Sequence, residues 1–335
     1  MSTRTSDEIA RAARTAVEAA VWAPSVHNTQ PWAFAVSGDE ISLRANPDRR
    51  LRLADEGGRQ MLISGGAALF DVRIALRELG YEPEVRVLPD PDRPLLLATV
   101  RLRAAGEADE HSRLLYGQIR KRRTHRAGFT GTPLPEDLVD ALVAQASTEG
   151  ACLTPVRSES AVRVLSAMTN AAQAVQGEDR GMSLEMIRWS SPAGSARRDG
   201  VPGRGDTGEP RRTFPQHFEQ RGYAWGNPRG AEADQSGSTS TGLVAVLTTT
   251  GDSREDWLAA GQGLQRVLLH ASAHGVRAAF HTQALEFPEL RRFLRRYVCS
   301  GASPQMIMRL GLVGNEDQDE VAGVRRPVSE VLEES

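Results

Sequence analysis

The segment APSVHNTQPWAF, residues 23–34, concentrates uncharged hydrogen-bonding side chains in one short loop. Ser25, His27, Asn28 and Gln30 lie between two prolines, and an apolar stretch follows directly. Neutral donors and acceptors of this kind suit the edge of a flat heteroaromatic ligand, which presents alternating N–H and C=O groups. The alternative is a turn whose side chains satisfy only their own backbone. The Pro-Trp pair and the apolar run that follow make a binding loop the more specific interpretation.

The second chemical signal is the basic run RKRRTHR, residues 120–126. Guanidinium groups beside a hydroxyl suit a phosphate, because an arginine fork can bind two phosphate oxygens at once. A solvated basic helix end explains the run equally well by itself. A further basic pair near the C-terminus is a candidate to close on the same phosphate. The candidate phosphate ligands are Arg122, Arg123, Thr124, Arg126, Arg325 and Arg326.

Composition argues against several classes of function. Lys121 is the only lysine among the 41 basic residues, which nearly excludes lysine-based mechanisms such as a Schiff base. The formal net charge of −2 predicts neither nucleic acid nor an anionic membrane as a partner. Because no apolar run approaches about 20 residues and no signal-peptide core is evident, we expect a cytoplasmic protein. Cys152 and Cys299 are expected to be reduced, buried thiols.

Hydrophobic spacing predicts a mixed α/β chain. A capping box at Thr5 and Glu8 begins an amphipathic helix that runs to about residue 22, and a hairpin follows over about residues 31–45. Further helices are predicted at 65–80, 136–146 and 259–275, and further strands at 82–89, 95–104, 242–250 and 305–314.

Two of the predicted helices form a weak internal repeat at a constant offset of 195 residues. The segments 66–80 and 261–275 both open and close on glycine, and they share the identities Gly66/Gly261, Leu69/Leu264, Val72/Val267 and Gly80/Gly275. Any two amphipathic helices with a C-terminal glycine share part of this pattern, but strands flank both copies, which favours a duplicated α/β unit. Two such units in one chain can pack like the halves of a symmetric dimer.

Residues 189–241 differ from the rest of the chain. They are rich in Gly, Pro, Ser and Arg and show little periodicity, which is typical either of a functional lid or of a disordered surface loop. An aromatic cluster in the middle of the segment favours a lid that packs on something. Its members are Phe214, Phe218, Tyr223 and Trp225.

Three other patterns carry no function. Residues 203–208 fit GxGxxG, but no strand precedes them and no apolar helix follows, so a dinucleotide-binding turn is not predicted. His270 and His274 are one helical turn apart, but no third metal ligand has suitable spacing, and we predict no metal site. No GxSxG sequence supports a serine hydrolase.

The loop motif APSxHNTQPWxF and the arginine motif RRTHRxGF resemble the two flavin-binding signatures of the FMN-dependent nitroreductase family. PQMIMRLG and the terminal RRP support the resemblance, which covers nearly the whole chain and extends to the Acg-like subfamily. It implies a mixed α/β (α+β) nitroreductase-like fold. In ordinary members, FMN lies at a homodimer interface, where one subunit holds the phosphate and the other contacts the ring.

In this sequence, the loop motif lies in the first half and the arginine motif in the second. The resemblance therefore implies two nitroreductase-like halves, 1–110 and 111–335, that form a pseudo-dimer within one chain, with 189–241 as a lid insertion. Because neither motif has a second copy, only one flavin is expected. A monomer is favoured, with a homodimer as the alternative.

The resemblance also implies roles for individual residues. Ser25, His27, Asn28 and Gln30 would contact the flavin, and the arginine motif with Arg325 and Arg326 would hold its phosphate. Gln283 and Glu286 fall where the family contacts the isoalloxazine edge. Asp71 departs from the Asn of many relatives, and no side chain is implied as a catalyst.

The implied activity is NAD(P)H-dependent two-electron reduction of a small nitroaromatic, quinone or related acceptor, with either NADH or NADPH as the donor. The alternative from another class is an FMN-sequestering protein whose lid blocks turnover. A scaffold that has lost FMN is a third interpretation, which the presence of both motifs disfavours.

Overall fold

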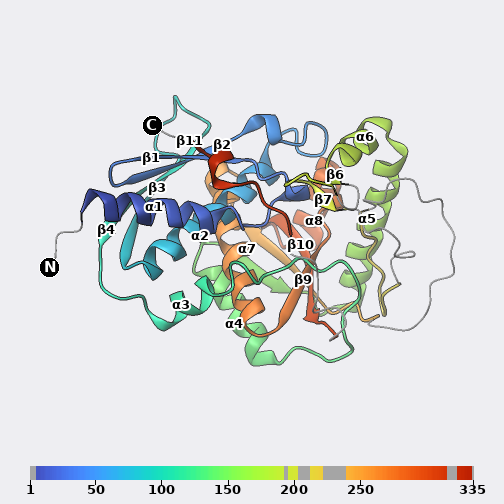
Figure 1. Cartoon of the computed structure of the whole chain (residues 1–335). Helices are drawn as coiled ribbons and strands as arrows, with labels where there is room; N and C mark the ends of the chain where they lie inside the picture. Colours follow the sequence, from blue (N-terminus) through green and yellow to red (C-terminus); the bar gives the residue numbers. More distant parts are fainter. Residues whose placement is uncertain (1–4, 192–194, 203–211, 222–238, 315–322, 334–335) are drawn as a thin grey trace.

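The computed structural model describes residues 5–191, 195–202, 212–221, 239–314 and 323–333 (Figure 1). In these ranges the chain forms two larger β-sheets that are joined across a central pair of long helices, with further helices at one end of the molecule. The mixed α/β class that the hydrophobic spacing predicts is confirmed.

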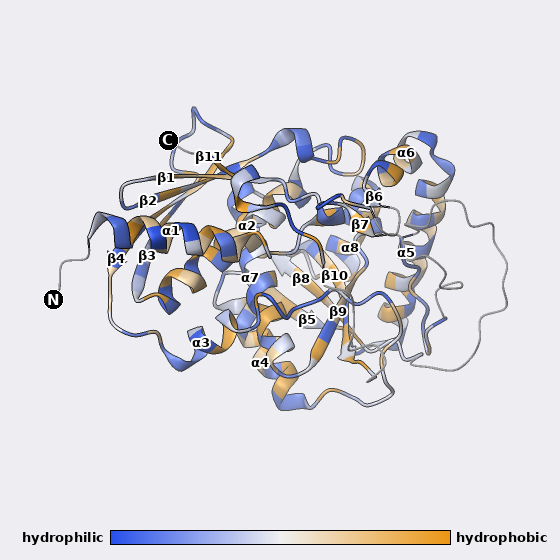
Figure 2. Cartoon of the chain, viewed as in Figure 1, coloured by the Kyte–Doolittle hydropathy of each residue, from blue (hydrophilic) through white to orange (hydrophobic). Residues whose placement is uncertain are grey.

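The first sheet holds the N-terminal part of the core. Its strand order is β11-β1-β2-β4-β3. Two helices, α1 (Ser6–Ala20) and α2 (Arg59–Glu78), pack against its apolar face. In Figure 2 hydrophilic and hydrophobic residues alternate along α1, as its amphipathic pattern requires. The strands are β1 (Trp32–Ser37), β2 (Glu40–Ala45), β3 (Tyr81–Val87), β4 (Leu96–Ala104) and β11 (Leu332–Glu333).

The second sheet is covered on both faces. Its order is β5-β8-β10-β9, from β5 (Cys152–Pro155), β8 (Leu243–Thr249), β9 (Val276–Phe280) and β10 (Ser303–Leu312). Ala245 and Leu247 of β8 pack with α4 (Glu136–Ser147) and α7 (Arg254–Ala273). Val244 and Val246 pack instead with α5 (Glu159–Glu178) and α8 (Pro288–Tyr297). Burial on both faces explains why β8 reads as a continuous apolar run.

Between β5 and β8 the chain forms the helices α5 and α6 and a small parallel pair of strands. The remaining described elements are short. The other elements are α3 (Glu110–Tyr116), α6 (Arg180–Arg188), β6 (Ser190–Ser191), β7 (Val201–Pro202) and the 3-10 turns η1 (Val26–Asn28), η2 (Pro47–Arg49), η3 (Gln283–Glu286) and η5 (Val328–Glu330).

The helices of the predicted repeat, α2 and α7, pack directly on each other. A Cβ atom added to Gly261 would lie 2.0 Å from the carbonyl oxygen of Ile63 and 2.8 Å from the Cα of Gly66. A Cβ on Gly66 would in turn meet Gly261 Cα at 3.0 Å. The first glycines of the two copies therefore face each other at the point where the helices cross. The last glycines, Gly80 and Gly275, both follow their helices with a positive φ, of 78° and 73°.

The C-terminal segment returns to the first sheet. β11 pairs in parallel with β1, with Phe34 opposite Leu332, and the backbone N–H of Phe34 donates to the carbonyl of Val331 at 2.6 Å. The segment that follows the second sheet thus completes the sheet of the first half.

Several local predictions have definite outcomes. The Thr5 and Glu8 capping box and the 32–45 hairpin are confirmed. The prediction of two buried thiols is wrong, because Cys152 is exposed and Cys299 is only partly buried. Cys152 is exposed because it begins β5, an edge strand whose residues alternate between the two faces. No helix among the described residues is long and apolar enough to span a membrane.

The Gly66–Gly261 contact yields a stability prediction. In Gly261→Ala, the new methyl group overlaps the backbone of α2, so the helices must separate and we expect a loss of at least about 2 kcal/mol of unfolding free energy. Urea unfolding followed by circular dichroism measures this change. Gly177→Ala in α5, where a Cβ meets nothing within 4 Å, is the matched control and should change stability by less than about 1 kcal/mol. Equal unfolding midpoints for the two variants would contradict the close helix contact.

Candidate functional site

The loop motif forms a tight turn in which three residues that are not glycine have positive φ. These are His27, Asn28 and Gln30, at 47°, 52° and 49°. Such conformations cost free energy, so the surroundings must hold them. The Ser25 hydroxyl contributes to this by accepting the backbone N–H of Gln30 at 3.0 Å, and Ser64 of α2 accepts the N–H of Val26 at 3.3 Å. The turn therefore presents its polar side chains in fixed directions.

The amide side chains of the turn bind two segments that cross it. Asn28 Nδ2 donates to the carbonyls of Gly200 at 3.0 Å and Val324 at 3.2 Å. Gln30 Nε2 donates to the carbonyl of Arg198 at 2.9 Å, and Gln30 Oε1 accepts the backbone N–H of Arg326 at 2.8 Å. Carbonyl groups of the 189–241 segment thus occupy donors that the resemblance assigns to the flavin.

The structure brings Arg325 to the arginine run. Burial and the charges of Arg122, Arg123 and Arg126 lower the pKa of Arg325 to about 9, although about 200 residues separate it from them in sequence. Burial is also the main cause that lowers the pKa of Arg122 to about 10, with further lowering by Arg123 and Arg126. Four guanidinium groups therefore lie close enough to repel one another. We call Arg122, Arg123, Arg126 and Arg325 the arginine cluster.

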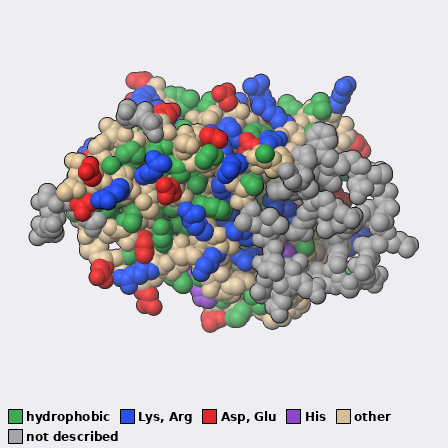
Figure 3. Space-filling model, viewed as in Figure 1, with side chains coloured by type: hydrophobic (Ala, Val, Ile, Leu, Met, Phe, Trp, Pro, Cys, Tyr) green, Lys and Arg blue, Asp and Glu red, His purple; other side chains and the backbone are tan. Residues whose placement is uncertain are grey.

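Two members of the arginine cluster, Arg122 and Arg325, have a donor to spare for an anion. The Nε atoms of Arg122 and Arg325 are buried and have no hydrogen-bond partner, and no carboxylate forms an ion pair with either side chain in the part of the chain that the structure describes. Thr124 lies beside them and accepts from Arg122 Nη1 at 3.3 Å. Figure 3 shows Lys and Arg side chains gathered over the middle of one face of the molecule. This donor set fits a phosphate group.

Arg326, the neighbour of Arg325, points elsewhere. Its Nε donates to Glu330 Oε2 at 3.1 Å, and its charge acts on Arg49 rather than on the arginine cluster. Arg325 instead lies over the ring of Trp22 at 5.5 Å, as do Arg120 at 5.3 Å and Arg123 at 6.0 Å. The adjacent arginines therefore have different surroundings.

One edge of the central helix pair faces the arginine cluster. Gln265 Nε2 of α7 donates to both carboxylate oxygens of Asp71 in α2, at 2.8 and 3.0 Å. Burial raises the pKa of Asp71 to about 8, and the positive charges of Arg122 and Arg325 oppose that rise. Asp71 is thus a buried acid whose charge state depends on the arginine cluster.

The other edge of the helix pair is filled. At the 195-residue offset, Phe70 and Arg266 are the counterparts of Gln265 and Asp71, and the Arg266 guanidinium lies 5.9 Å from the centre of the Phe70 ring. Arg73 lies 5.6 Å from the same ring, and both arginines form ion pairs with the buried carboxylate of Glu149. Apolar and paired groups leave no donors comparable to those of the arginine cluster on this side.

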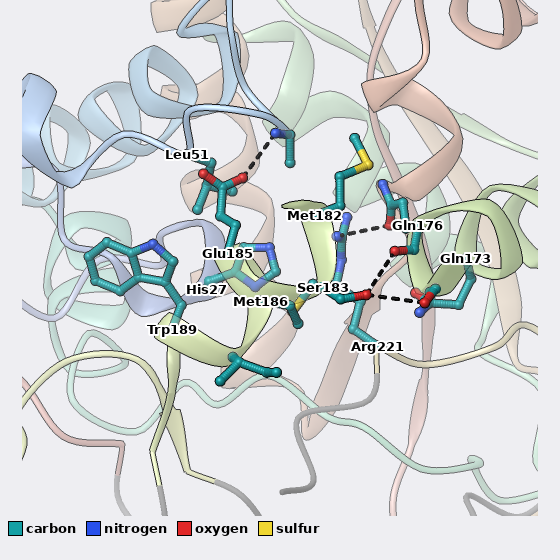
Figure 4. A pocket seen from close by; sticks show the side chains of 13 residues that line it. His27, Leu51, Gln173, Gln176, Met182, Ser183, Glu185, Met186, Trp189 and Arg221 are labelled. Atoms are coloured by element: carbon teal, nitrogen blue, oxygen red, sulfur yellow. Dashed lines mark hydrogen bonds between the residues drawn. The ribbon is translucent and has the colours of Figure 1, made fainter. Parts of the chain in front are cut away.

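A cavity of about 170 Å³ lies between α5, α6 and the loop 51–54 (Figure 4). His27 lines this cavity, and burial, followed by the charges of Arg221 and Arg126, lowers the pKa of its ring. The lining residues are His27, Leu51, Ala54, Gln173, Gln176, Gly177, Met182, Ser183, Glu185, Met186, Ile187, Trp189 and Arg221.

A buried ionic network forms one wall of the cavity. Arg221 pairs with the fully buried carboxylate of Glu286, which also accepts from Gln176 Nε2 at 2.6 Å and from Gln60 Nε2 of α2 at 2.9 Å. Gln283, which the resemblance implies as a flavin contact, is buried beside this wall and donates to Gln173 Oε1 at 3.2 Å. The Oε1 atom of Gln283 is buried and unpartnered.

Helix α6 closes the cavity through Glu185. The two carboxylate oxygens of Glu185 accept the backbone N–H groups of Arg52, Leu53 and Ala54, at distances from 2.5 to 3.3 Å. A single side chain therefore fastens α6 to the first half of the chain.

Comparison with known proteins decides the family. No model of a known protein family matches the chain. "Putative NAD(P)H nitroreductase Rv3131" of Mycobacterium tuberculosis is 31% identical over 327 residues, which cover 97% of this chain and 92% of that protein. The chain belongs to the NAD(P)H nitroreductase family. "Putative NAD(P)H nitroreductase acg" of the same organism is 28% identical to this nitroreductase over 322 residues, or 95% and 94% of the two chains.

Solved nitroreductases give weaker matches. NfnB of Mycobacterium smegmatis, solved in complex with NADPH, matches with a TM-score of 0.40 and 16% identity over 67% of this chain and 99% of its own. The FMN-bound nitroreductase of Desulfitobacterium hafniense matches with a TM-score of 0.38 and 13% identity over 68% and 98%. Scores this low carry no argument, so membership rests on the sequence relatives.

Sequence reasoning about this nitroreductase missed the cavity walls. Helices α5 and α6 precede the predicted lid, and neither Arg221 nor Glu185 belongs to a motif. Of the aromatic cluster, Phe218 is buried and packs against His281, whereas Phe214 is 68% exposed. Tyr223, Trp225 and the GxGxxG stretch lie outside the described residues. In the part that is described, no group of three or more His, Cys, Asp or Glu side chains could hold a metal ion.

The buried histidines near the site predict loss of stability in acid. His281 accepts from Arg309 Nε at 2.8 Å, and burial, followed by the Arg309 charge, holds its pKa well below 6.5. The folded protein keeps this ring neutral while the unfolded chain takes up a proton, so the stabilisation is complete above pH 6.5 and declines as the pH falls below it. At pH 5 one such histidine costs about 2 kcal/mol.

Urea unfolding of the wild type and of His281→Asn at pH 7.5 and pH 5 tests this prediction. Asparagine retains an acceptor for Arg309 but does not titrate. The variant should therefore lose about 2 kcal/mol less than the wild type on acidification. The same loss in both proteins would contradict a neutral His281. Burial also lowers the pKa of His27, so His27 adds the same acid-dependent loss of stability to the wild type and to the variant.

Proposed function

We propose that this chain binds one FMN and uses it in the two-electron reduction of a small-molecule acceptor by NADH or NADPH. The observation that carries the proposal is the arginine cluster, which joins Arg325 to the 122–126 run beside the strained loop 25–30. FMN, when bound, accepts and returns a hydride, so the protein needs to supply orientation and electrostatics rather than an acid or base.

The proposed phosphate ligands combine Arg122 and Arg325, whose buried Nε atoms have no hydrogen-bond partner, with two neighbouring groups. Arg122, Arg126 and Arg325, with the Thr124 hydroxyl, would neutralise a phosphate dianion through charge-assisted hydrogen bonds. Burial is the main cause that lowers the pKa values of Arg122 and Arg325, and a phosphate would relieve the repulsion between their charges that adds to it. Ser25, His27, Asn28, Gln30 and Gln283 are proposed contacts for the ring. The resemblance implies these residues, His27 lines the cavity, and Gln283 has a buried Oε1 atom without a partner.

The overall reaction is balanced without a catalytic side chain. NAD(P)H gives up a hydride and solvent gives one proton, so that a quinone, for example, takes up two electrons and two protons and becomes the quinol. Nitroaromatic compounds take up electron pairs in the same way. The chain's own contribution is to hold His27 neutral in a buried position and to exclude water with α6 and the segment 197–201.

A pseudo-dimer accounts for a single flavin. We propose that residues 1–110 and 111–335 correspond to two family subunits whose long helices meet at Gly66 and Gly261. The edge with Asp71 and Gln265 would serve the flavin, while Phe70 and the paired arginines fill the opposite edge. The return of β11 to the first sheet resembles an arm exchanged between subunits. A chain that contains both halves needs no second copy, which favours a monomer.

Flavin sequestration is a second candidate function, and the closed state of the lid favours it. Asn28 and Gln30 are bound to carbonyl groups of the 197–201 segment, and Glu185 fastens α6 over the cavity. The cavity of about 170 Å³ is also smaller than the roughly 300 Å³ or more of a typical ligand pocket. A donor and an acceptor can then reach the flavin only when these contacts open.

Adjacent arginines offer a matched test of the phosphate site. Arg325→Gln removes a buried guanidinium of the arginine cluster and should weaken FMN binding about 10- to 100-fold, as measured by flavin fluorescence. Riboflavin, which lacks the phosphate, should bind both proteins equally. Arg326→Gln is the control, because Arg326 binds Glu330. A larger loss of FMN affinity in Arg326→Gln than in Arg325→Gln would overturn the assignment.

Anaerobic reduction of the FMN-loaded protein by NADPH and NADH separates the two candidate functions. An oxidoreductase should lose its oxidised flavin absorbance within minutes, and Glu185→Ala, which releases α6, should accelerate the loss several-fold. Glu178→Ala, at the exposed end of α5, is the control and should match the wild type. A flavin that only dithionite reduces in the wild type, but that NADPH reduces in Glu185→Ala, would favour sequestration. A protein that binds no FMN would refute both.

A further inference from the structure

We infer that the cavity under α6 receives an uncharged acceptor ring with an alkyl tail, such as an alkyl-substituted quinone, rather than a charged nitroaromatic. The inference rests on the proposed function and names its acceptor. It depends on three features of the described residues: the pairing of every charge in the lining, the apolar wall and the apolar exit.

The charged groups that line the cavity are already paired. Arg221 binds Glu286, and Glu185 accepts three backbone N–H groups. His27 is fully buried between two arginine charges, and burial disfavours its protonation. A charged acceptor would therefore lose its hydration without gaining a partner ion, whereas an uncharged ring loses little.

The apolar residues of the cavity lining suit planar rings of more than one shape. Leu51, Met182, Met186 and Trp189 are lining residues, and Figure 4 shows Leu51 and Trp189 on the side of the cavity away from Arg221 and Gln176. Methionine side chains adapt to different shapes, and an indole offers a flat face for stacking. These lining residues favour a class of planar apolar acceptors.

A substituent longer than a few atoms must leave the cavity. At about 170 Å³ the space is too small for a ring and a tail together. Ile187 both lines the cavity and is 41% exposed, so it connects the interior with the surface. Leu53, next to the lining residue Ala54, is 50% exposed, and its Cδ1 lies 2.9 Å from where a Cβ on Gly181 of α6 would be. Of Ile187 and Leu53 only Ile187 lines the cavity, so Ile187 is the apolar side chain past which a tail would leave.

Helix geometry supplies a control residue. Val175 is 52% exposed on α5, so it is apolar and accessible like Ile187, but it does not line the cavity. It is two positions from both Gln173 and Gly177, which places it on the side of α5 opposite these lining residues. A tail that leaves past Ile187 should not touch Val175.

The test compares two benzoquinones with identical rings, one with a methyl and one with a decyl substituent, on wild type, Ile187→Asn and Val175→Asn. Quenching of intrinsic tryptophan fluorescence measures the Kd, and NADPH oxidation by the FMN-loaded protein measures kcat/KM. In the wild type the decyl compound should bind at least about tenfold more tightly. Ile187→Asn should remove most of that advantage, because it should weaken binding of the decyl compound far more than binding of the methyl compound. Val175→Asn should retain the advantage.

Each outcome has a separate meaning. Equal Kd values for the two quinones in the wild type, or an equal loss of the tail's advantage in Ile187→Asn and Val175→Asn, would overturn the inference. Tighter binding of 4-nitrobenzoate than of its uncharged methyl ester would also overturn it. Tail-dependent binding without NADPH oxidation would retain the inference about the cavity while the oxidoreductase function failed. NADPH oxidation without tail dependence would leave the proposed function standing alone.

Discussion

The backbone contact between Gly66 and Gly261 is the constraint on which the arrangement of this protein depends. Two helices can approach until their Cα atoms nearly touch only where neither carries a side chain, and each of these glycines meets the other at that point. The contact brings Asp71 of one helix to Gln265 of the other and Phe70 to Arg266. These two pairs are counterparts at the 195-residue offset, so the single crossing point of α2 and α7 sets the composition of both edges of the helix pair. One sheet packs on each side of the same two helices.

The two edges of the helix pair differ in their chemistry. The Asp71 edge faces guanidinium groups that have spare donors, whereas the Arg266 edge is closed by ion pairs to Glu149. Buried charges are tolerated only when they are paired, neutralised or awaiting an ion. The filled edge satisfies this requirement within the protein. The buried Nε atoms of Arg122 and Arg325 have no partner among the described residues, and an anionic ligand at that edge would supply one.

Helices and strands could be predicted from the sequence where hydrophobic periodicity and local motifs determine them. Site residues could be predicted where they belong to a continuous motif. The offset that aligns Gly66 with Gly261 predicted a repeated unit but not that these two glycines touch, because a contact between helices leaves no trace in their spacing. The sequence could not distinguish Arg325 from Arg326, because their different surroundings arise from Trp22 and Glu330, which tertiary packing supplies. The contacts of Arg221 and Glu185 likewise join distant segments and leave no local pattern.

The strained loop connects the lid with the proposed ligand. Positive φ values at three non-glycine residues cost of the order of 1 kcal/mol each, and the hydrogen bonds of Asn28 and Gln30 help to hold them. Both amides donate to carbonyl oxygens of the 197–201 segment, and carbonyl oxygens are also what the pyrimidine edge of a flavin would present. Exchange of one acceptor for the other changes little in hydrogen-bond free energy. The loop would therefore keep its conformation whether its amides bind the 197–201 segment or a flavin. The arginine cluster, rather than the loop, would then determine the affinity for the flavin.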